Sequence, residues 1–427
     1  MTSEMKSHRI RDICQTYSGG TPSRDKEEYY VQPPNGHPWL ASRELNGGKI
    51  YSAEEHISEM GLQNSSAKYF PKDTVLIAMY GATAGRVGVL GAPMTTSQAI
   101  CGMMAHKELC SQRFLYYLIC NESWKIVWEN ALGAAQPNIS QQSILRHNVE
   151  LPSTRNQEKI LKILDPIEEG IELNQKISIV LNQKIQSLFR SWFIDFDPVK
   201  AKIGGKLPYG MDEETAALFP YSFEDSELGP IPTGWNWGKL GDCISVVGGG
   251  TPSTKNEEFW DGEYNWTSPK DLSNSNSIIM LDTERTITEA GLAKVSSGLL
   301  PENTVLMSSR APIGYLALTK IPVAINQGYI AIPPKNSMSP NFMLSWIHFN
   351  MPLIEAYSSG STFPEISKKE FRKLPILIPP AELIEKFNEK TTRLYDSMET
   401  SLKQMNSLIS TRDALLPRMM SGELSVS

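Results

Sequence analysis

Two stretches of the chain have apolar residues at the spacing of a long amphipathic helix. From Ile160, alternate steps of four and three residues reach Trp192 through ten positions, eight of them apolar. The same walk from Phe387 to Met419 meets seven apolar positions in ten. A mean period of 3.5 residues is typical of a coiled-coil seam. We therefore predict two helices of similar length that pack against each other; the alternative is two separate helices, each packed on its own domain.

Three polar or helix-breaking residues within these stretches bear on how the helices pack. Pro166 lacks a backbone N–H, so we expect it to kink the first helix or to mark a new start. Asn174 and Ser401 are both polar seam positions and lie 227 residues apart. A buried polar pair can determine the register of a helix pair at some cost in stability.

The rest of the chain contains an internal repeat. The segment Ser18-Gly19-Gly20-Thr21-Pro22-Ser23 recurs as Gly248-Gly249-Gly250-Thr251-Pro252-Ser253, at an offset of 230. Trp39 through Leu45 matches Trp266 through Leu272 at an offset of 227, and further matches keep the same order over about 140 residues. The repeat predicts two copies of one domain, residues 1–152 and 233–379, each followed by a helical segment, 153–199 and 380–427.

Residues 200–232 have no counterpart in the other copy, and they are rich in proline and glycine, which predicts a linker. Three of its residues are basic and six acidic, so it carries half of the net charge of −6. The two repeated domains are therefore close to neutral. Overall acidity excludes a simple polycation that coats nucleic acid, but it is weak evidence against a local basic face.

Composition narrows the class of protein further. Hydrophobic residues make up 40% of the 427 residues and charged residues 21%, as in globular proteins. No apolar run is long enough to span a membrane, and the amino-terminal residues lack the apolar core of a signal peptide, so we expect a cytoplasmic protein that contacts no membrane. Five scattered cysteines and six scattered histidines predict neither a disulfide framework nor a zinc site.

A search for catalytic motifs finds none. The Gly-Gly-Thr-Pro segments continue neither as a phosphate-binding P-loop nor as a dinucleotide fingerprint, and a turn after a strand is the simpler interpretation. A nucleophile elbow and the Asn/Asp-Pro-Pro-aromatic motif of base methylation are also missing. The sequence therefore predicts a chain without a catalytic centre, metal or cofactor of its own.

Loops at equivalent places in the two copies combine basic with hydroxylic and aromatic residues, a composition suited to phosphates and base edges. Each of these basic residues could equally be a solvated surface charge. The candidate DNA-binding residues are Arg24, Arg43 and Arg86 in the first copy and Lys255, Lys270 and Arg310 in the second.

Three further segments carry a resemblance to a known family. These are Ser187 through Pro198, Glu213 through Pro220 with Gly229 through Trp235, and Leu415 through Leu424. Together with the duplicated Gly-Gly-Thr-Pro-Ser openings, they make the chain similar to the specificity subunits of type I restriction–modification systems over essentially its whole length.

The resemblance implies an α+β fold, with two similar α/β target recognition domains separated by long helices that form an antiparallel coiled coil. It implies that each domain recognises one half of a split, asymmetric site in double-stranded DNA. The helices would serve as spacer and as docking surface for methyltransferase subunits, and restriction subunits would join the assembly. S-adenosylmethionine would bind the methyltransferase partner, and this chain would be non-catalytic.

Two hypotheses from other classes remain beside this one. The chain could be a coiled-coil scaffold that organises protein partners without binding DNA, or a phosphate-handling enzyme that uses the Gly-Gly-Thr-Pro loops. The missing catalytic motifs count against the enzyme, and the paired basic loops count against the scaffold.

Overall fold

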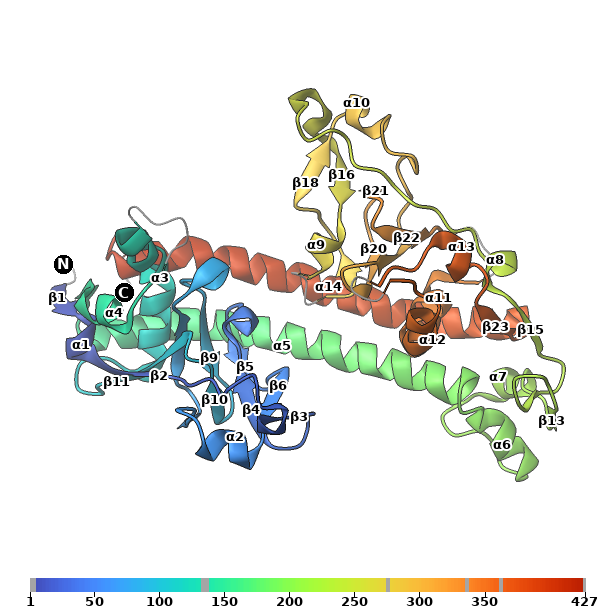
Figure 1. Cartoon of the computed structure of the whole chain (residues 1–427), viewed down its shortest axis with the longest axis horizontal. Helices are drawn as coiled ribbons and strands as arrows, with labels where there is room; N and C mark the ends of the chain where they lie inside the picture. The colour runs from blue at the N-terminus through green and yellow to red at the C-terminus, as the bar shows by residue number, and fades with distance from the viewer. Residues whose placement is uncertain (1–4, 132–137, 274–276, 335–337, 361–363, 425–427) are drawn as a thin grey trace. The chain divides into compact units, whose positions relative to one another are not determined.

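The computed structural model of the chain describes residues 5–131, 138–273, 277–334, 338–360 and 364–424. It divides into two compact units, unit 1 (residues 1–173 and 404–427) and unit 2 (residues 174–403). Two 40-residue helices, α5 (Thr154–Phe193) and α14 (Ala381–Met420), each pass from one unit into the other (Figure 1). None of the helices in the described part of the chain is long and apolar enough to cross a lipid bilayer.

Unit 1 is built from two five-stranded sheets, a strand pair and short helices. Its strands are β1 (Lys6–Arg9), β2 (Cys14–Ser18), β3 (Tyr30–Val31), β4 (His37–Leu40), β5 (Lys49–Ile50), β6 (Glu55–Ile57), β7 (Tyr69–Phe70), β8 (Val75–Ala78), β9 (Val87–Leu90), β10 (Met94–Thr96), β11 (Ile100–Ala105) and β12 (Asn148–Leu151). Its other helices are α1 (Ile10–Ile13), η1 (Glu27–Tyr29), η2 (Ser42–Glu44), α2 (Glu59–Gln63), η3 (Gly81–Thr83), α3 (Gln112–Ala131) and α4 (Gln141–Arg146). The sheet orders are β3-β6-β4-β10-β7 and β2-β11-β8-β9-β5, and β1 pairs with β12.

Unit 2 repeats this plan with fewer strands. Its strands are β13 (Phe223–Glu224), β14 (Ile231–Pro232), β15 (Asn236–Lys239), β16 (Trp260–Thr267), β17 (Ile279–Met280), β18 (Arg285–Ile287), β19 (Val305–Ser309), β20 (Ile313–Thr319), β21 (Ala324–Ile325), β22 (Tyr329–Ile332) and β23 (Pro375–Ile378). Its other helices are α6 (Asp197–Ile203), α7 (Glu213–Ala217), α8 (Leu240–Cys243), η4 (Glu257–Phe259), α9 (Pro269–Ser273), α10 (Glu289–Leu292), α11 (Pro340–Phe349), α12 (Met351–Ala356) and α13 (Lys368–Phe371). The sheets are β18-β16-β21 and β17-β20-β19-β22, with the pairs β15-β23 and β13-β14.

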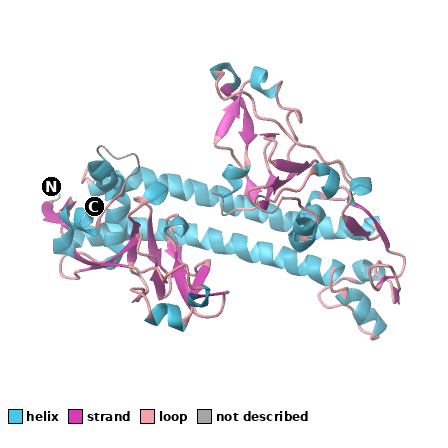
Figure 2. Cartoon of the chain, viewed as in Figure 1, coloured by secondary structure: helices cyan, strands magenta, loops and turns pink. Residues whose placement is uncertain are grey.

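The strand pairings match between the two units. In unit 1, β4 lies between antiparallel β6 and parallel β10, and in unit 2, β16 lies between antiparallel β18 and parallel β21. The other sheet of each unit is covered by a helix, α3 in unit 1 and α11 in unit 2. In Figure 2 the strands of each unit gather beside the long helices. The repeat in the sequence thus corresponds to a repeat in strand order and direction.

Glycines of the repeated Gly-Gly-Thr-Pro-Ser segment are required by close packing. A Cβ atom on Gly19 would lie 2.3 Å from the carbonyl oxygen of Thr96. At the equivalent place in unit 2, a Cβ atom on Gly249 would lie 1.7 Å from the carbonyl oxygen of Ile325. Real Cβ contacts are never this short, so any other residue would push the segment off the neighbouring strand. Residues 19–23 and 248–253 are irregular stretches held against the neighbouring strand, and the turn follows them, at residues 24–25 and 254–255, so the prediction that the segment itself is the turn is wrong.

A tryptophan of each unit binds this segment from the other side. Trp39 donates its indole N–H to the carbonyl oxygen of Gly20 at 2.8 Å, and Trp266 donates to that of Gly250 at 3.1 Å. A buried indole N–H needs an acceptor, and a carbonyl oxygen of the glycine segment supplies it in both units. The same hydrogen bond between a tryptophan and the glycine segment is therefore present in both copies of the repeat.

The seam positions of α5 and α14 are buried or half-buried along both helices, as the 3.5-residue period predicts. Asn174 and Ser401 are both buried, with 8% and 7% of their surface exposed. α5 runs through Pro166 as one helix, so this proline does not mark a new start. The surrounding helix is supported by packing along the whole seam, and this support outweighs one missing backbone hydrogen bond.

Within each unit the two long helices run antiparallel. In unit 1, Arg412 of α14 contacts Glu168 of α5, and Leu416 packs in the same core as Leu164, so residue numbers rise on one helix as they fall on the other. In unit 2, the ring of Phe387 near the start of α14 packs against Phe189 and Trp192 near the end of α5. Both units therefore contain the antiparallel coiled-coil arrangement.

Residues 200–232 include short elements that pack on unit 2. Met211, Ala216 and Phe219 are buried in the same core as the end of α5. Lys202 donates its ammonium to the carbonyl oxygen of Ala216 at 2.9 Å and also to that of Phe219. These contacts attach much of the segment to the aromatic core rather than leaving it as an extended connection.

Candidate nucleic-acid interface

Two of the predicted DNA-binding side chains of unit 1 converge on one carboxylate. Arg24 and Arg43 both donate to Glu55, and the Nη2 atom of Arg43 lies 2.8 Å from it. Arg43 also donates to one oxygen of Glu54, from Nη2 at 3.1 Å and from Nε at 3.2 Å. The hydrogen bond from Arg24 and the one from Arg43 lower the pKa of Glu55, although partial burial opposes them. Both guanidinium groups are therefore held in place instead of moving freely in solvent.

Aromatic rings hold Arg24 from a second direction. Its guanidinium carbon lies 4.3 Å from the ring centroid of Tyr30 and 5.0 Å from that of Trp39. The two rings meet edge to face, with centroids 6.2 Å apart. Trp39 on β4 lies opposite Glu55 on β6 in the strand register. The sheet thus places the carboxylate and the ring that together orient this arginine.

The loop of Arg86 adjoins the loop of Arg43. Thr83 donates its hydroxyl to that of Ser42 at 3.2 Å, which joins residues 80–86 to η2. Arg86 itself is exposed at the end of this loop. Two separate basic segments of the sequence therefore form one surface in unit 1.

In unit 2, two predicted residues come together in a pocket. Lys270 and Arg310 both line a cavity of about 410 Å³. Each is paired with an acidic side chain, Lys270 with Glu284 at 3.2 Å and Arg310 with Glu365 at 3.7 Å. The complete lining is Ser268, Pro269, Lys270, Ser273, Arg310, Ala311, Asn326 and Gly328. The two cations, the hydroxyl groups and the amide can donate hydrogen bonds to phosphates and to purine edges.

A third basic residue of unit 2, Arg285, stacks on one ring of an aromatic pair. Its guanidinium carbon lies 3.4 Å from the ring centroid of Trp260, and Trp260 meets Trp266 edge to face at 5.1 Å. Trp266 lies opposite Arg285 in the strand register. Lys255 is exposed in the turn after the repeated glycine segment, and it does not line the Lys270–Arg310 pocket.

Sequence reasoning missed Glu55 and Arg285, although the repeat contained the signal for both. At the offset of 230, Glu54 corresponds to Glu284, and Glu55 corresponds to Arg285. The strand register confirms this correspondence, because Glu55 lies opposite Trp39 and Arg285 lies opposite Trp266. A comparison of charge at matched positions would have found the pair.

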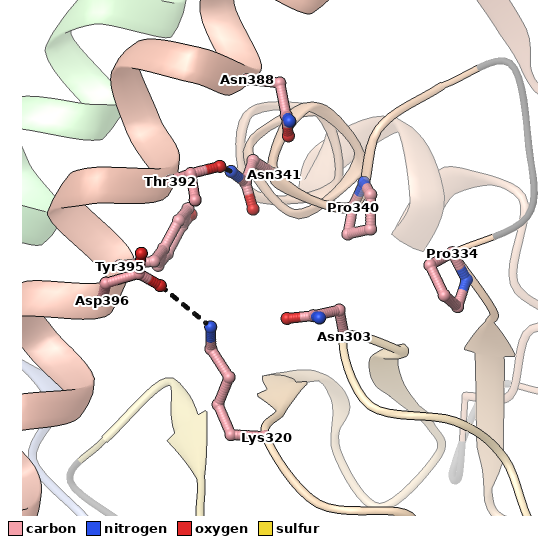
Figure 3. Close-up of a pocket in the computed structure, with 9 residues that line it drawn as sticks. All are labelled: Asn303, Lys320, Pro334, Pro340, Asn341, Asn388, Thr392, Tyr395 and Asp396. Carbon is pink, nitrogen blue, oxygen red and sulfur yellow. Dashed lines mark hydrogen bonds and ion pairs between the residues drawn. The ribbon is translucent and has the colours of Figure 1, made fainter.

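A second cavity of unit 2, of about 290 Å³, lies between the sheet region and α14 (Figure 3). Lys320 points toward α14, with Nζ 3.4 Å from Asp396 (Figure 3). The same Nζ lies 3.3 Å from Glu399. The amide of Asn341 donates to the hydroxyl of Thr392 at 3.1 Å. Because the ammonium of Lys320 is already balanced by two carboxylates, the cavity offers no free charge to an anion. We interpret it as part of the attachment of unit 2 to its own helix.

Metal-binding chemistry is also missing from the described part of the chain, where no three histidine, cysteine or acidic side chains gather closely enough to hold an ion. Three cysteines of unit 1, Cys14, Cys101 and Cys110, are buried, and burial raises the pKa of Cys101 to about 12. The arrangement can therefore bind anions and polar edges through its basic surfaces, and that is the chemistry it offers.

A comparison with models of known protein families identifies the family of this chain. The model described as "Type I restriction modification DNA specificity domain" matches residues 2–183 and again residues 232–404. The chain belongs to this family. The two matches correspond to the two copies seen in the sequence and to the matched strand pairings of the two units.

Members of the family with similar sequences come from bacteria and archaea. The HindI specificity subunit of Haemophilus influenzae is 27% identical over 358 residues, which cover 73% of this chain and 77% of that protein. The MjaIX specificity subunit of Methanocaldococcus jannaschii is 26% identical over 429 residues, covering 98% and 93%. Among solved structures, the S subunit of a type I restriction–modification system from M. genitalium aligns with a TM-score of 0.50 at 15% identity, covering 98% of this chain and 96% of that one. This likeness supports the specificity-subunit fold.

Proposed function

We propose that this chain is the sequence-recognition subunit of a type I restriction–modification complex, and that it recognises a bipartite, asymmetric site in double-stranded DNA. Residues 1–152 would recognise one half and residues 233–379 the other, with the helical segments 153–199 and 380–427 as spacers and residues 200–232 as the connection. It would act in the cytoplasm, where the DNA of a bacterial or archaeal cell lies.

One observation carries this proposal most strongly. Both units build a basic, aromatic surface on equivalent strands, yet the charged residues at matched positions differ, as at Glu55 and Arg285. A common framework with different contact residues is what two half-sites of different sequence require. The proposed contacts are Arg24, Arg43, Arg86, Lys255, Lys270 and Arg310, and we add Arg285 because it stacks on Trp260 beside them.

The chemistry would belong to partners. The chain would dock methyltransferase subunits, which bind S-adenosylmethionine, and restriction subunits would join them, while this chain remains non-catalytic. A near-neutral chain makes few phosphate contacts by itself. We therefore expect weak DNA binding by the isolated chain and a large gain when the methyltransferase subunits are present.

The test is to express the chain with its methyltransferase subunits in a cell without other methylation and to sequence the methylome. A single split motif is expected, and Arg43→Ala and Lys270→Ala should relax different halves of it. No methylation, together with no binding to a random duplex library, would favour the scaffold hypothesis instead.

The helices would also determine the gap between the half-sites. Seven residues inserted near Lys184, with seven more near Thr411, keep the seam in phase and lengthen each helix by about 10.5 Å. The gap in the methylated motif should grow by about three base pairs, at 3.4 Å each. A doubly extended chain that assembles but still methylates the original gap would contradict the spacer role.

A further inference from the structure

The arginines of the two recognition surfaces have different partners, and the difference arises at a single strand position. In unit 1 the position opposite Trp39 holds Glu55, which binds Arg24 and Arg43. In unit 2 the position opposite Trp266 holds Arg285. No carboxylate oxygen of the described residues lies within ion-pair distance of Arg285, which rests on Trp260 alone.

The ion pair next to this strand position is present in both units. Arg43 pairs with Glu54 in unit 1, and at the matched positions Lys270 pairs with Glu284 in unit 2. The charges at the matched positions of unit 1 are therefore two arginines and two glutamates, which cancel. In unit 2 the corresponding residues are Thr254, Lys270, Glu284 and Arg285, which leave one positive charge.

Phosphate and carboxylate compete for the N–H edge of a guanidinium group, because each is an anion with two oxygens that can accept two parallel N–H donors. A phosphate that approaches the N–H groups bound by Glu55 must displace this carboxylate, and a phosphate at the remaining N–H groups of Arg24 or Arg43 lies close enough to be repelled by it. A base edge carries no net charge, so the carboxylate of Glu55 does not repel it in this way. An internal carboxylate therefore weakens non-specific binding more than it weakens base recognition.

Resting on the proposed function, we infer that Glu55 is a specificity-determining residue, which holds Arg24 and Arg43 toward base edges and away from phosphates. Arg285, at the same strand position, gives unit 2 the phosphate contact that unit 1 lacks. Unit 1 thus contributes sequence discrimination with little general affinity, and unit 2 contributes both.

The experiment uses the complete complex with its methyltransferase subunits. Binding is measured on three duplexes of equal length, one with the methylated motif, one with the unit 1 half-site scrambled and one with both halves scrambled, each over a series of salt concentrations. The variants are Glu55→Gln, Glu55→Arg and Arg285→Gln. Glu150→Gln is the matched control, because it removes the same charge from an exposed position on β12 of unit 1.

For Glu55→Gln we expect affinity for the fully scrambled duplex to rise by on the order of tenfold, and the salt slope to steepen by about 1 to 2 as freed arginines meet phosphates. Affinity for the motif should rise less, so the specificity ratio falls. Glu55→Arg should act in the same direction and more strongly, and the sheet accommodates arginine at this position in unit 2. Arg285→Gln should flatten the slope and weaken binding to all three duplexes alike.

The outcomes separate the inference from the proposed function. If the parental complex prefers the motif but Glu55→Gln and Glu55→Arg bind scrambled duplex no better than Glu150→Gln, the inference is wrong and the proposed function stands. Weaker binding to every duplex would also overturn it, because Glu55 would then only support the loop; thermal unfolding of each variant shows whether that has happened. If the parental complex shows no preference for any sequence, the proposed function fails and the inference fails with it.

Discussion

At equivalent places along the two long helices, unit 1 has an ion pair and unit 2 has uncharged side chains. In unit 1, Arg412 of α14 lies 3.2 Å from Glu168 of α5, whose side chain is only 6% exposed. The residues 227 positions away are Ile185 on α5 and Tyr395 on α14, both buried in the core of unit 2. One backbone arrangement thus tolerates two kinds of contact between the helices, a paired charge in unit 1 and packing in the core in unit 2.

The difference extends beyond the seam. Unit 1 attaches α3 to α5 by an ion pair between Arg113 and Asp165 at 2.8 Å. The matched contact of unit 2 is the neutral hydrogen bond from Asn341 to Thr392. Around it, unit 2 gathers an aromatic core that includes Phe189, Phe193, Phe342 and Phe387. Unit 1 should therefore respond more to changes in charge and pH, and unit 2 more to lost volume.

The largest effect is expected for Phe387→Ala in unit 2. The ring is fully buried and meets the rings of Phe189, Trp192, Phe193 and Phe342. Removing it should lower the free energy of unfolding by about 3–5 kcal/mol, since lost contacts and a cavity add together. Urea unfolding measures the change. The control is Tyr209→Ala at a fully exposed position, which should stay within about 0.5 kcal/mol of the parent.

A comparable but smaller loss should follow Arg412→Ile in unit 1. The variant leaves Glu168 buried without its cation, which should cost about 3 kcal/mol. The double variant Glu168→Tyr/Arg412→Ile installs the residues of unit 2 and should recover most of that loss, because a buried ion pair can be replaced by well-packed apolar groups. A double variant no more stable than Arg412→Ile would show that the two seams are not interchangeable.

Substitutions of the basic residues in each unit should weaken recognition of a different half-site, with a loss of binding free energy smaller than the stability losses above. Arg43→Ala or Arg86→Ala should weaken recognition of one half-site, and Lys270→Ala or Arg310→Ala that of the other, by about 1–3 kcal/mol where the side chain contacts a base. Duplexes with single substitutions across the motif locate each effect. A phosphate contact would instead weaken all sequences alike, and unchanged binding in all four variants would place the interface elsewhere.

The smallest effect is a pH dependence of opposite sign in the two units. Burial lowers the pKa of His147 in unit 1, but the carboxylates of Glu122 and Glu129, at 3.2 and 2.8 Å, outweigh burial, so its pKa is raised above 6.5. This contribution to stability is complete below pH 6.5 and is lost as the pH rises through the raised pKa. Burial lowers the pKa of His348 in unit 2, so its contribution is lost as the pH falls.

Hydrogen exchange of peptides from each unit, followed from about pH 5.5 to 8.5 and corrected for the intrinsic rate, measures both signs, because the ordinary histidine pKa of about 6.5 lies within that range. His147→Leu, which installs the residue of Leu374 at the matched position of unit 2, should remove the acid-side stabilisation of unit 1 only. His348→Gln should remove the alkaline-side stabilisation of unit 2 only. Equal slopes in parent and variants would contradict the assignment.

Some features of this protein follow from the sequence by itself. The duplication is visible because Gly19 and Gly249 occupy places where packing leaves no room for a Cβ atom, and because Trp39 and Trp266 make the same hydrogen bond in both copies. The seams of α5 and α14 are visible because a helical period is a local property of the chain. The predicted basic loops likewise come from local composition.

Only the tertiary structure decided which of these residues meet. Arg24, Arg43 and Glu55 lie apart in the sequence, and the pairing of β4 with β6 brings the carboxylate to the two arginines. The stacking of Arg285 on Trp260 depends on β16 and β18 in the same way. α5 continues through Pro166 because packing along the whole seam outweighs one local penalty. Local periodicity determines elements, whereas charge pairing depends on strand register, which is set by the packing of the complete core.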